Sequence, residues 1–163
     1  MATSTCWQRV PVDRPDIAVG PTLSREPRVL QVARDHPLAA RDRVSIEDIA
    51  DYHVMPLDGF PGETVDAIIP HTTPLGRPVR RRRLRLTPRT PFEVEALVAR
   101  GVIVHPTVPS YADYFRHPDV LHVPIHDMPP VTTGLVWRRG SSDPRLHEFV
   151  RFTRDVIAGR QPV

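Results

Sequence analysis

Apolar and polar positions alternate along the chain in short blocks that change period. Short runs of three to seven residues predict strands at residues 16–19, 28–33, 53–57, 80–86, 102–104, 120–125 and 132–138, most of them rich in apolar residues and one of them, 80–86, rich in arginine. Helical spacing of apolar positions predicts helices over residues 45–50, 63–69, 90–100, 110–115 and 144–158. Alternating strands and helices favour an α/β protein with a largely parallel or mixed sheet.

The helix over residues 90–100 has the strongest local signals. Thr90 offers a capping hydroxyl, Pro91 suits the first helical position, and Glu93 completes a capping box. Gly101 is expected to end this helix, and its apolar stripe consists of Val94, Leu97 and Val98. Residues 141–144, Ser-Ser-Asp-Pro, mark the start of the terminal helix in the same way.

Composition is that of a folded protein in spite of 20 prolines in 163 residues, because 40% of the residues are hydrophobic. A chain of this length can bury one core, or two small lobes around a hinge. Cys6 is the only cysteine, so no disulfide can form within the chain. No apolar run approaches the roughly 18 residues of a membrane span, and residues 1–10 lack the apolar centre of a secretory signal, which favours the cytoplasm.

Positive charge is concentrated in one segment. All 22 basic residues are arginines, and seven of them lie between residues 67 and 92 without a single acid: Arg77, Arg80, Arg81, Arg82, Arg83, Arg85 and Arg89. If residues 80–86 form a strand, alternate arginines face opposite sides and the charge is split between two faces. We therefore expect no sequence-specific DNA binding by this chain, and expect these arginines to pair with acids of a partner subunit rather than with phosphates.

The order of these motifs resembles the effector-binding domain of LysR-type transcriptional regulators. The features that carry the resemblance are Asp-Ile-Ala-Val-Gly at 16–20, the strand 28–33, His-Pro-Leu-Ala at 36–39 with the following helix, Gly101 to Pro106, residues 121–125, and the strand 135–138 before a terminal amphipathic helix. Together they cover about residues 16–158. The resemblance implies an α/β fold of the periplasmic-binding-protein-like type (type 2).

This resemblance also implies a domain division. Residues 1–15 would be an N-terminal tail, residues 16–33 and 132–163 part of a first lobe, and residues 34–131 a complete second lobe. The strands 28–33 and 132–138 would be adjacent and would cross between the lobes, with the terminal helix outside the second lobe. The family's winged helix-turn-helix and half of the first lobe have no counterpart in this sequence, so we expect self-association or marginal stability.

Candidate ligand-binding residues lie at predicted strand ends. Family effectors are small organic acids or aromatic compounds, and Thr87, Arg89 and Thr90 supply hydrogen-bond donors where a strand ends and a helix begins. The alternative is that Thr90 is only a cap and Arg89 only a solvated charge. Phe92 could form a ligand wall, although a core position is the better interpretation.

Two further groups belong to the same predicted site. His105 and Thr107 follow the strand 102–104 and would face the same cleft, or would be ordinary loop residues. Asp58, Gly59 and Phe60 follow another strand end and have a weaker claim. No metal or cofactor is expected, since His122 and His126 would lie about 13 Å apart on a strand.

Three functions remain open at this point. The first is an effector-sensing, oligomerising module of a LysR-type regulator that is not an enzyme and reaches DNA only through a winged-helix domain absent from this chain. The second is a stand-alone cytoplasmic small-molecule-binding protein of periplasmic-binding-protein-like fold. The third is a small α/β enzyme, which is disfavoured because no acid, base and nucleophile set is visible.

Overall fold

The computed structural model describes residues 14–55, 65–66, 68–85 and 88–159. These residues divide into two compact units. One contains the described residues up to Arg25 and from Val131 on, and we call it the ribbon unit; the other spans Glu26–Pro130, and we call it the sheet unit. Each unit is described by itself.

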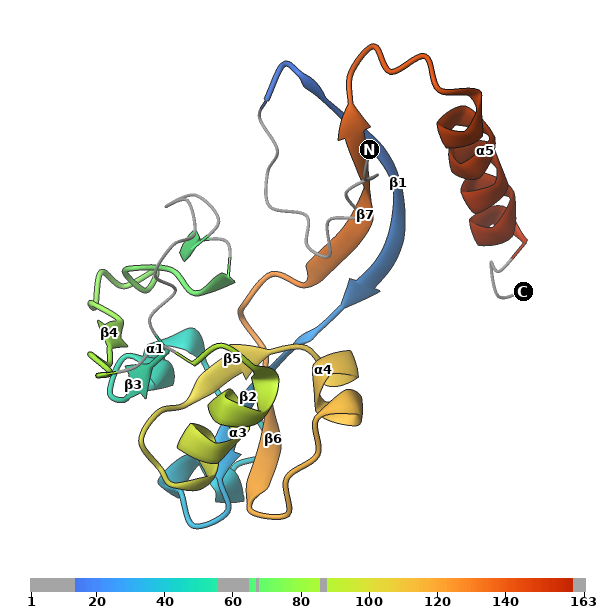
Figure 1. Ribbon diagram of the computed structural model, residues 1–163. Coiled ribbons are helices and arrows are strands. Elements are labelled where there is room, and N and C mark those ends of the chain that lie inside the picture. Colours follow the sequence, from blue (N-terminus) through green and yellow to red (C-terminus); the bar gives the residue numbers. More distant parts are fainter. Residues whose placement is uncertain (1–13, 56–64, 67, 86–87, 160–163) are drawn as a thin grey trace. The chain divides into compact units, whose positions relative to one another are not determined.

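The sheet unit is built around a three-stranded antiparallel sheet with the strand order β5-β2-β6 (Figure 1). The strands are β5 (His105–Thr107), β2 (Arg28–Ala33) and β6 (Val120–Ile125). Every residue of the central strand β2 is buried. In the register of the sheet, Gln31 is the Cα partner of both His105 and His122. These three residues therefore form one row across the sheet.

Short helices cover both faces of this sheet. The helical elements are η1 (Pro37–Ala40), α1 (Ile46–Ile49), α3 (Pro91–Ala99) and α4 (Pro109–Tyr114). Leu30 and Val32 of β2 belong to the larger core cluster, which also contains residues of η1 and α1. Gln31 between them contacts α3 instead, because successive side chains of a strand point to opposite faces. α3 thus covers one face of β2, and η1 and α1 cover the other.

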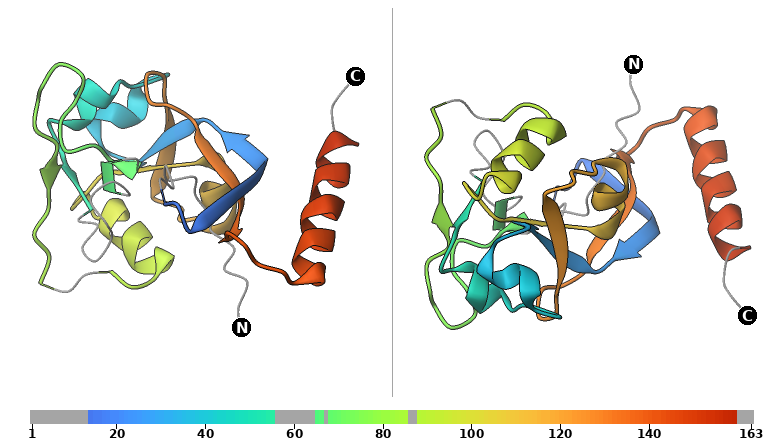
Figure 2. Two further views of the ribbon diagram at one scale, coloured as in Figure 1. Left: turned by 90° about the horizontal axis from the view of Figure 1, so that it is seen from above. Right: turned by 90° about the horizontal axis from the view of Figure 1, so that it is seen from below.

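The ribbon unit consists of two paired strands and one helix. The strand β1 (Ile17–Glu26) pairs with β7 (Val131–Arg138), and the two lie side by side in Figures 1 and 2. At one end the hydroxyl of Ser24 is 2.5 Å from that of Thr133, and at the other the Arg139 amide donates to the carbonyl of Asp16, so the strands run in opposite directions. The helix α5 (Pro144–Ala158) follows.

Local signals in the sequence predict the helix boundaries well. Thr90 and Glu93 form the expected capping box of α3, and Ser45 and Asp48 form that of α1. α5 begins after the capping carboxylate of Asp143, which accepts from the amide of residue 145, and it ends at Gly159. The strands at 28–33, 120–125 and 132–138 are confirmed as well. Among the described residues no helix has the length and apolar character to cross a membrane.

Two of the predicted strands differ from those in the structure. The run 80–86 forms a strand, β4, only at Arg80–Arg81, paired in parallel with β3 (His53–Val54), and the arginines at 82, 83 and 85 are exposed outside it. The alternation of side chains expected for a continuous strand therefore does not apply beyond Arg81. The predicted strand 102–104 contributes only a single bridge from Val104 to Val54, and the regular strand begins at His105. A turn at Gly101, which has a φ of 65°, precedes the strand, so regular pairing begins only at His105.

The three-stranded sheet is antiparallel, whereas β3 and β4 pair in parallel, so the described strands pair in both senses, which agrees with the mixed alternative and not with a largely parallel sheet. The predicted neighbour of the strand 28–33 is wrong. The strand at 28–33 pairs with β5 and β6, whereas β7 pairs with β1. The fully buried β2 requires a partner on each edge, and two strands of the same unit provide them. β1 and β7 instead carry the chain into and out of the sheet unit, at Glu26 and Pro130. Residues 28–33 thus belong to the sheet unit and not to the ribbon.

Candidate functional site

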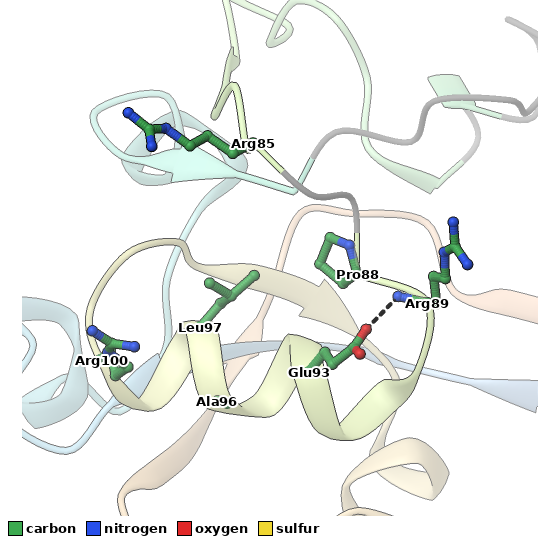
Figure 3. A pocket seen from close by; sticks show the side chains of 7 residues that line it. All are labelled: Arg85, Pro88, Arg89, Glu93, Ala96, Leu97 and Arg100. Atoms are coloured by element: carbon green, nitrogen blue, oxygen red, sulfur yellow. Dashed lines mark hydrogen bonds between the residues drawn. The ribbon is translucent and has the colours of Figure 1, made fainter.

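A cavity of about 750 Å³ lies beside α3 (Figure 3). One wall is the helix face that carries Glu93, Leu97 and Arg100, which are spaced at helical intervals of four and three residues. The other wall is the segment before the helix, with Arg85 and Arg89. The complete lining is Arg85, Pro88, Arg89, Glu93, Ala96, Leu97 and Arg100. The described lining therefore contains three arginines, one glutamate and three apolar residues.

Side chains at the start of α3 accept hydrogen bonds from the backbone amides there. The Thr90 hydroxyl accepts from the Glu93 amide at 3.3 Å, and the Glu93 carboxylate accepts from the amides of Arg89 at 2.5 Å and Thr90 at 3.2 Å. Glu93, the only acid among the described residues of the lining, is thus held by backbone groups rather than by an arginine (Figure 3). Among the described residues, the guanidinium groups of Arg85, Arg89 and Arg100 form no ion pair, so the described lining carries a net positive charge.

A second polar feature is the buried row His105–Gln31–His122. The Gln31 side-chain amide donates to Glu95 Oε1 of α3 at 2.5 Å and lies 3.0 Å from Nε2 of His122. Glu95 and Gln31 are almost completely buried. Burial raises the pKa of Glu95 and lowers the pKa of His122.

His105 ends this row at β5. Its burial, with a smaller contribution from the charge of Arg28, lowers its pKa to about 4, so the ring is neutral near pH 7. The ring contacts the edge of Tyr111 from α4, with centroids 5.8 Å apart, and burial raises the pKa of Tyr111 to about 12. Both groups are therefore uncharged in the neutral range; the His105 ring packs on Tyr111, and the Tyr111 hydroxyl donates to the carbonyl of Pro91 at 3.4 Å.

The predicted ligand-binding residues lie in different places. Arg89 lines the cavity beside α3, and Thr90 caps the helix. Phe92 is 69% exposed and meets only the edge of Phe115 at 5.4 Å, so it is neither in the core nor in the cavity lining. His105 and Thr107 are buried on β5 and do not line that cavity. The predicted residues Thr87, Asp58, Gly59 and Phe60 lie outside the described residues.

Sequence reasoning missed Arg85 and Arg100 as partners of Arg89. The helical spacing of Glu93, Leu97 and Arg100 could have placed Arg100 on the same helix face as Glu93. The preceding segment, which contains Arg85 and Arg89, forms the opposite wall. The polar row was signalled by Gln31 alone, a single polar residue inside the apolar strand Val-Leu-Gln-Val-Ala. Within the ranges that the structure describes, no three His, Cys, Asp or Glu side chains gather in a metal-binding cluster.

The fold places this chain in a known class of ligand-sensing domains. The family model described as LysR substrate binding domain matches residues 8–158. The chain therefore belongs to the LysR substrate-binding domain family, and its periplasmic-binding-protein-like α/β fold is that of the effector-sensing domain of LysR-type transcriptional regulators. The match takes up nearly all 163 residues.

Solved structures of LysR-type regulators share the fold. Full-length CbnR complexed with its target DNA has 20% sequence identity to this chain and a TM-score of 0.65. The alignment covers 87% of this chain and 49% of the CbnR chain. A hydrogen-peroxide-bound OxyR mutant from Corynebacterium glutamicum is 18% identical with a TM-score of 0.67, with 91% and 47% covered. The regulatory domain of MetR from N. meningitidis is 21% identical with a TM-score of 0.65, with 92% and 70% covered.

The chain thus spans about half the length of the full-length regulators that it matches. At these sequence identities the likeness establishes the fold. A search of curated proteins finds no match.

Proposed function

We propose that the sheet unit binds a small organic acid, with an aliphatic or aromatic body, in the cavity beside α3. The observation that carries the proposal is the presence of Arg85, Arg89 and Arg100 in the lining of one cavity, where the only acid among the described lining residues is already held by backbone amides. Guanidinium groups bind carboxylates with paired hydrogen bonds. Membership of an effector-sensing family supports a binding role rather than a catalytic one.

The apolar side of the cavity sets the class of ligand. Leu97 is half-buried, and with Ala96 and Pro88 it forms a surface without hydrogen-bonding side chains. A ligand whose carboxylate contacts the arginines can pack its hydrocarbon part against this apolar surface. Small-molecule sites commonly combine apolar walls with a few polar groups that orient the ligand. A cavity of about 750 Å³ is large enough for a metabolite of one or two rings.

The wider role follows from the family. A LysR-type effector domain would couple this binding to transcription in a homo-oligomer in the cytoplasm, with DNA contacted through a winged-helix domain outside this chain. Use of the same cavity by a stand-alone binding protein is the second candidate. Identification of a winged-helix segment upstream in the same reading frame would favour the first.

A thermal-shift screen of small carboxylates and aromatic acids tests the binding proposal. A ligand present at 100 times its dissociation constant adds about 2.7 kcal/mol to the free energy of unfolding. For a hit, Arg89→Gln and Arg85→Gln are expected to weaken binding at least tenfold, because each removes a charge at the cavity wall.

The matched control is Arg43→Gln, which removes another exposed arginine of the same unit that does not line the cavity. If the Arg89→Gln and Arg43→Gln proteins bind a confirmed ligand with equal affinity, the ligand does not bind in the cavity beside α3. Absence of any hit among carboxylates would contradict the proposed ligand class.

A further inference from the structure

A second cavity of about 430 Å³ lies between α4, β2 and β6 of the sheet unit. Its polar lining contains Arg34, Asp113, Arg116, His117 and His122. Val29 of β2 forms part of the apolar lining. None of these residues lines the cavity beside α3, so the two cavities are separate.

The buried row fixes the protonation of His122. The Glu95 carboxylate is an acceptor, so the Gln31 atom at 2.5 Å from it must be the NH₂ group. The same NH₂ group lies 3.0 Å from Nε2 of His122, which must therefore accept. A neutral imidazole that accepts at Nε2 carries its proton on Nδ1. Nδ1–H is then the donor that His122 has available for a ligand in the cavity.

His117 has the opposite tautomer to His122. Its Nδ1 accepts from the backbone amide of Asp119 at 3.1 Å, so a neutral ring carries its proton on Nε2. No acceptor for that N–H is found among the described residues. Two histidines of one cavity thus present N–H donors whose tautomers are set by neighbours outside the cavity.

Arginines add positive charge to these donors. The Arg34 guanidinium is anchored by donating to the carbonyl of Pro118, which leaves further N–H groups of its five. Arg116 forms an exposed pair with Asp113 at 3.2 Å, and Asp113 is the only acid of the lining. One acid against two arginines leaves the cavity with a net positive charge.

We propose that this second cavity is a binding site for a small oxyanion, a carboxylate or a phosphate group, held by His122, His117 and Arg34. Glu95 and Gln31 are positioning residues for His122, because they determine which ring nitrogen carries the proton. The site is additional to the cavity beside α3 and does not depend on the proposed effector binding there.

Side-chain NMR of the ¹⁵N-labelled full chain tests the site. Inorganic phosphate and succinate are titrated separately at constant ionic strength, with chloride as the control salt. The expected result is a saturable shift of the His122 and His117 ring nitrogens with one or both anions, and a rise in the pKa of His122, because a nearby anion favours the imidazolium. The two arms distinguish a phosphate from a carboxylate site.

Arg34→Gln is the matched variant, since Arg34 is exposed and its loss is compatible with folding. It is expected to weaken the anion effect at least tenfold, whereas Arg43→Gln leaves it unchanged. Shifts that are equal in chloride, or that are the same in both variants, would overturn the proposal. Arg89→Gln, which tests the cavity beside α3, is expected to have no effect here, so the two proposals can fail separately.

Glu95→Met tests the positioning role, because methionine has a similar length and offers no oxygen acceptor. Without that acceptor, the Gln31 amide is free to turn its oxygen toward His122, which then takes its proton on Nε2. The ¹⁵N shifts of His122 in the absence of anion report this change of tautomer. An unchanged tautomer in a folded Glu95→Met protein would show that Glu95 and Gln31 have only a structural role.

Discussion

The two units of the chain differ in how much apolar surface they bury. Nearly all buried apolar side chains of the described residues lie in the sheet unit, and the exceptions are Leu135 and Val150. Large apolar side chains are exposed in both units, but in the ribbon unit they outnumber the buried ones: Val19, Leu23, Phe149 and Phe152 are exposed there, and Leu75, Phe92 and Tyr114 in the sheet unit. A two-stranded ribbon is marginally stable by itself, whereas three strands covered by helices can sustain a core. The sheet unit therefore has the means to fold by itself, and the ribbon unit depends on additional cover.

The largest expected difference comes from core truncation. Leu30→Ala removes a fully buried side chain of the central strand and is expected to cost about 2 to 5 kcal/mol of unfolding free energy. Leu135→Ala in the ribbon unit is expected to leave the stability of the sheet unit nearly unchanged. Native-state hydrogen exchange of the β2 amides measures both effects. Equal loss of protection in the two variants would show that the units unfold together.

The buried His105 makes the stability of the sheet unit depend on pH. Its folded pKa of about 4 lies below the ordinary 6.5, so the unfolded chain takes up a proton first as the pH falls. The stability contribution is complete above pH 6.5 and is lost toward pH 4, by up to about 3 kcal/mol. Urea unfolding at pH 7 and at pH 4.5 measures this loss.

His105→Gln is expected to remove this pH dependence, and His147→Gln, in the exposed part of the ribbon unit, is expected to keep it. Glu95 acts in the opposite direction, because its raised pKa stabilises the fold at low pH and this contribution is lost as the pH rises. The difference between wild type and variant therefore isolates the histidine. A His105→Gln protein with the wild-type pH profile would contradict the burial of this ring.

A packing change in the ribbon unit is expected to have a local effect. A Cβ atom at Gly20 would lie 2.6 Å from the indole of Trp137 and 3.2 Å from Leu135, so Gly20→Val should disrupt the pairing of β1 and β7 by about 1 to 3 kcal/mol. The indole NMR signal of Trp137 reports the ribbon, and Val19→Thr on the exposed side is the control. Unchanged Trp137 signals in Gly20→Val would refute the close contact.

The smallest expected effects are those of the helix caps. Thr90→Ala should lower the stability of the sheet unit by about 1 kcal/mol, while Thr90→Ser preserves the capping oxygen. Asp143→Ala should fray the first turn of α5 without changing the unfolding of the sheet unit. Chemical shifts of the helix amides distinguish local fraying from global loss. A global effect of Asp143→Ala would connect α5 to the core of the other unit.

Sequence-based prediction succeeded where the determining interactions are local. The capping box of Thr90 and Glu93 involves neighbours in the sequence, so the start of α3 could be predicted from the residues themselves. The resemblance to the LysR family gave the fold. The pairing of β2 could not be predicted, because its partners β5 and β6 lie far along the chain. The sequence of a buried apolar strand also does not indicate which strands pair with its two edges.

The candidate site shows the same limit. Arg89 could be proposed from the sequence because it precedes a recognisable helix, whereas the place of Arg85 in the same cavity lining depends on how residues 82–85 leave the strand β4. The interpretation of the arginine run as a continuous strand was wrong beyond Arg81. His122 was considered only as a metal ligand, since its contact with Gln31 arises from the register of the sheet.

The central position of β2 has a consequence during synthesis on the ribosome. Gln31 lies 91 residues before its partner His122, and translation proceeds at about 5 to 20 residues per second. The strand Val-Leu-Gln-Val-Ala therefore leaves the ribosome roughly 5 to 20 seconds before β6 can pair with it. During this interval an apolar strand with two free edges is available to chaperones and to other nascent chains. Codons that slow translation between residues 34 and 119 would lengthen this exposure and lower the yield of folded protein.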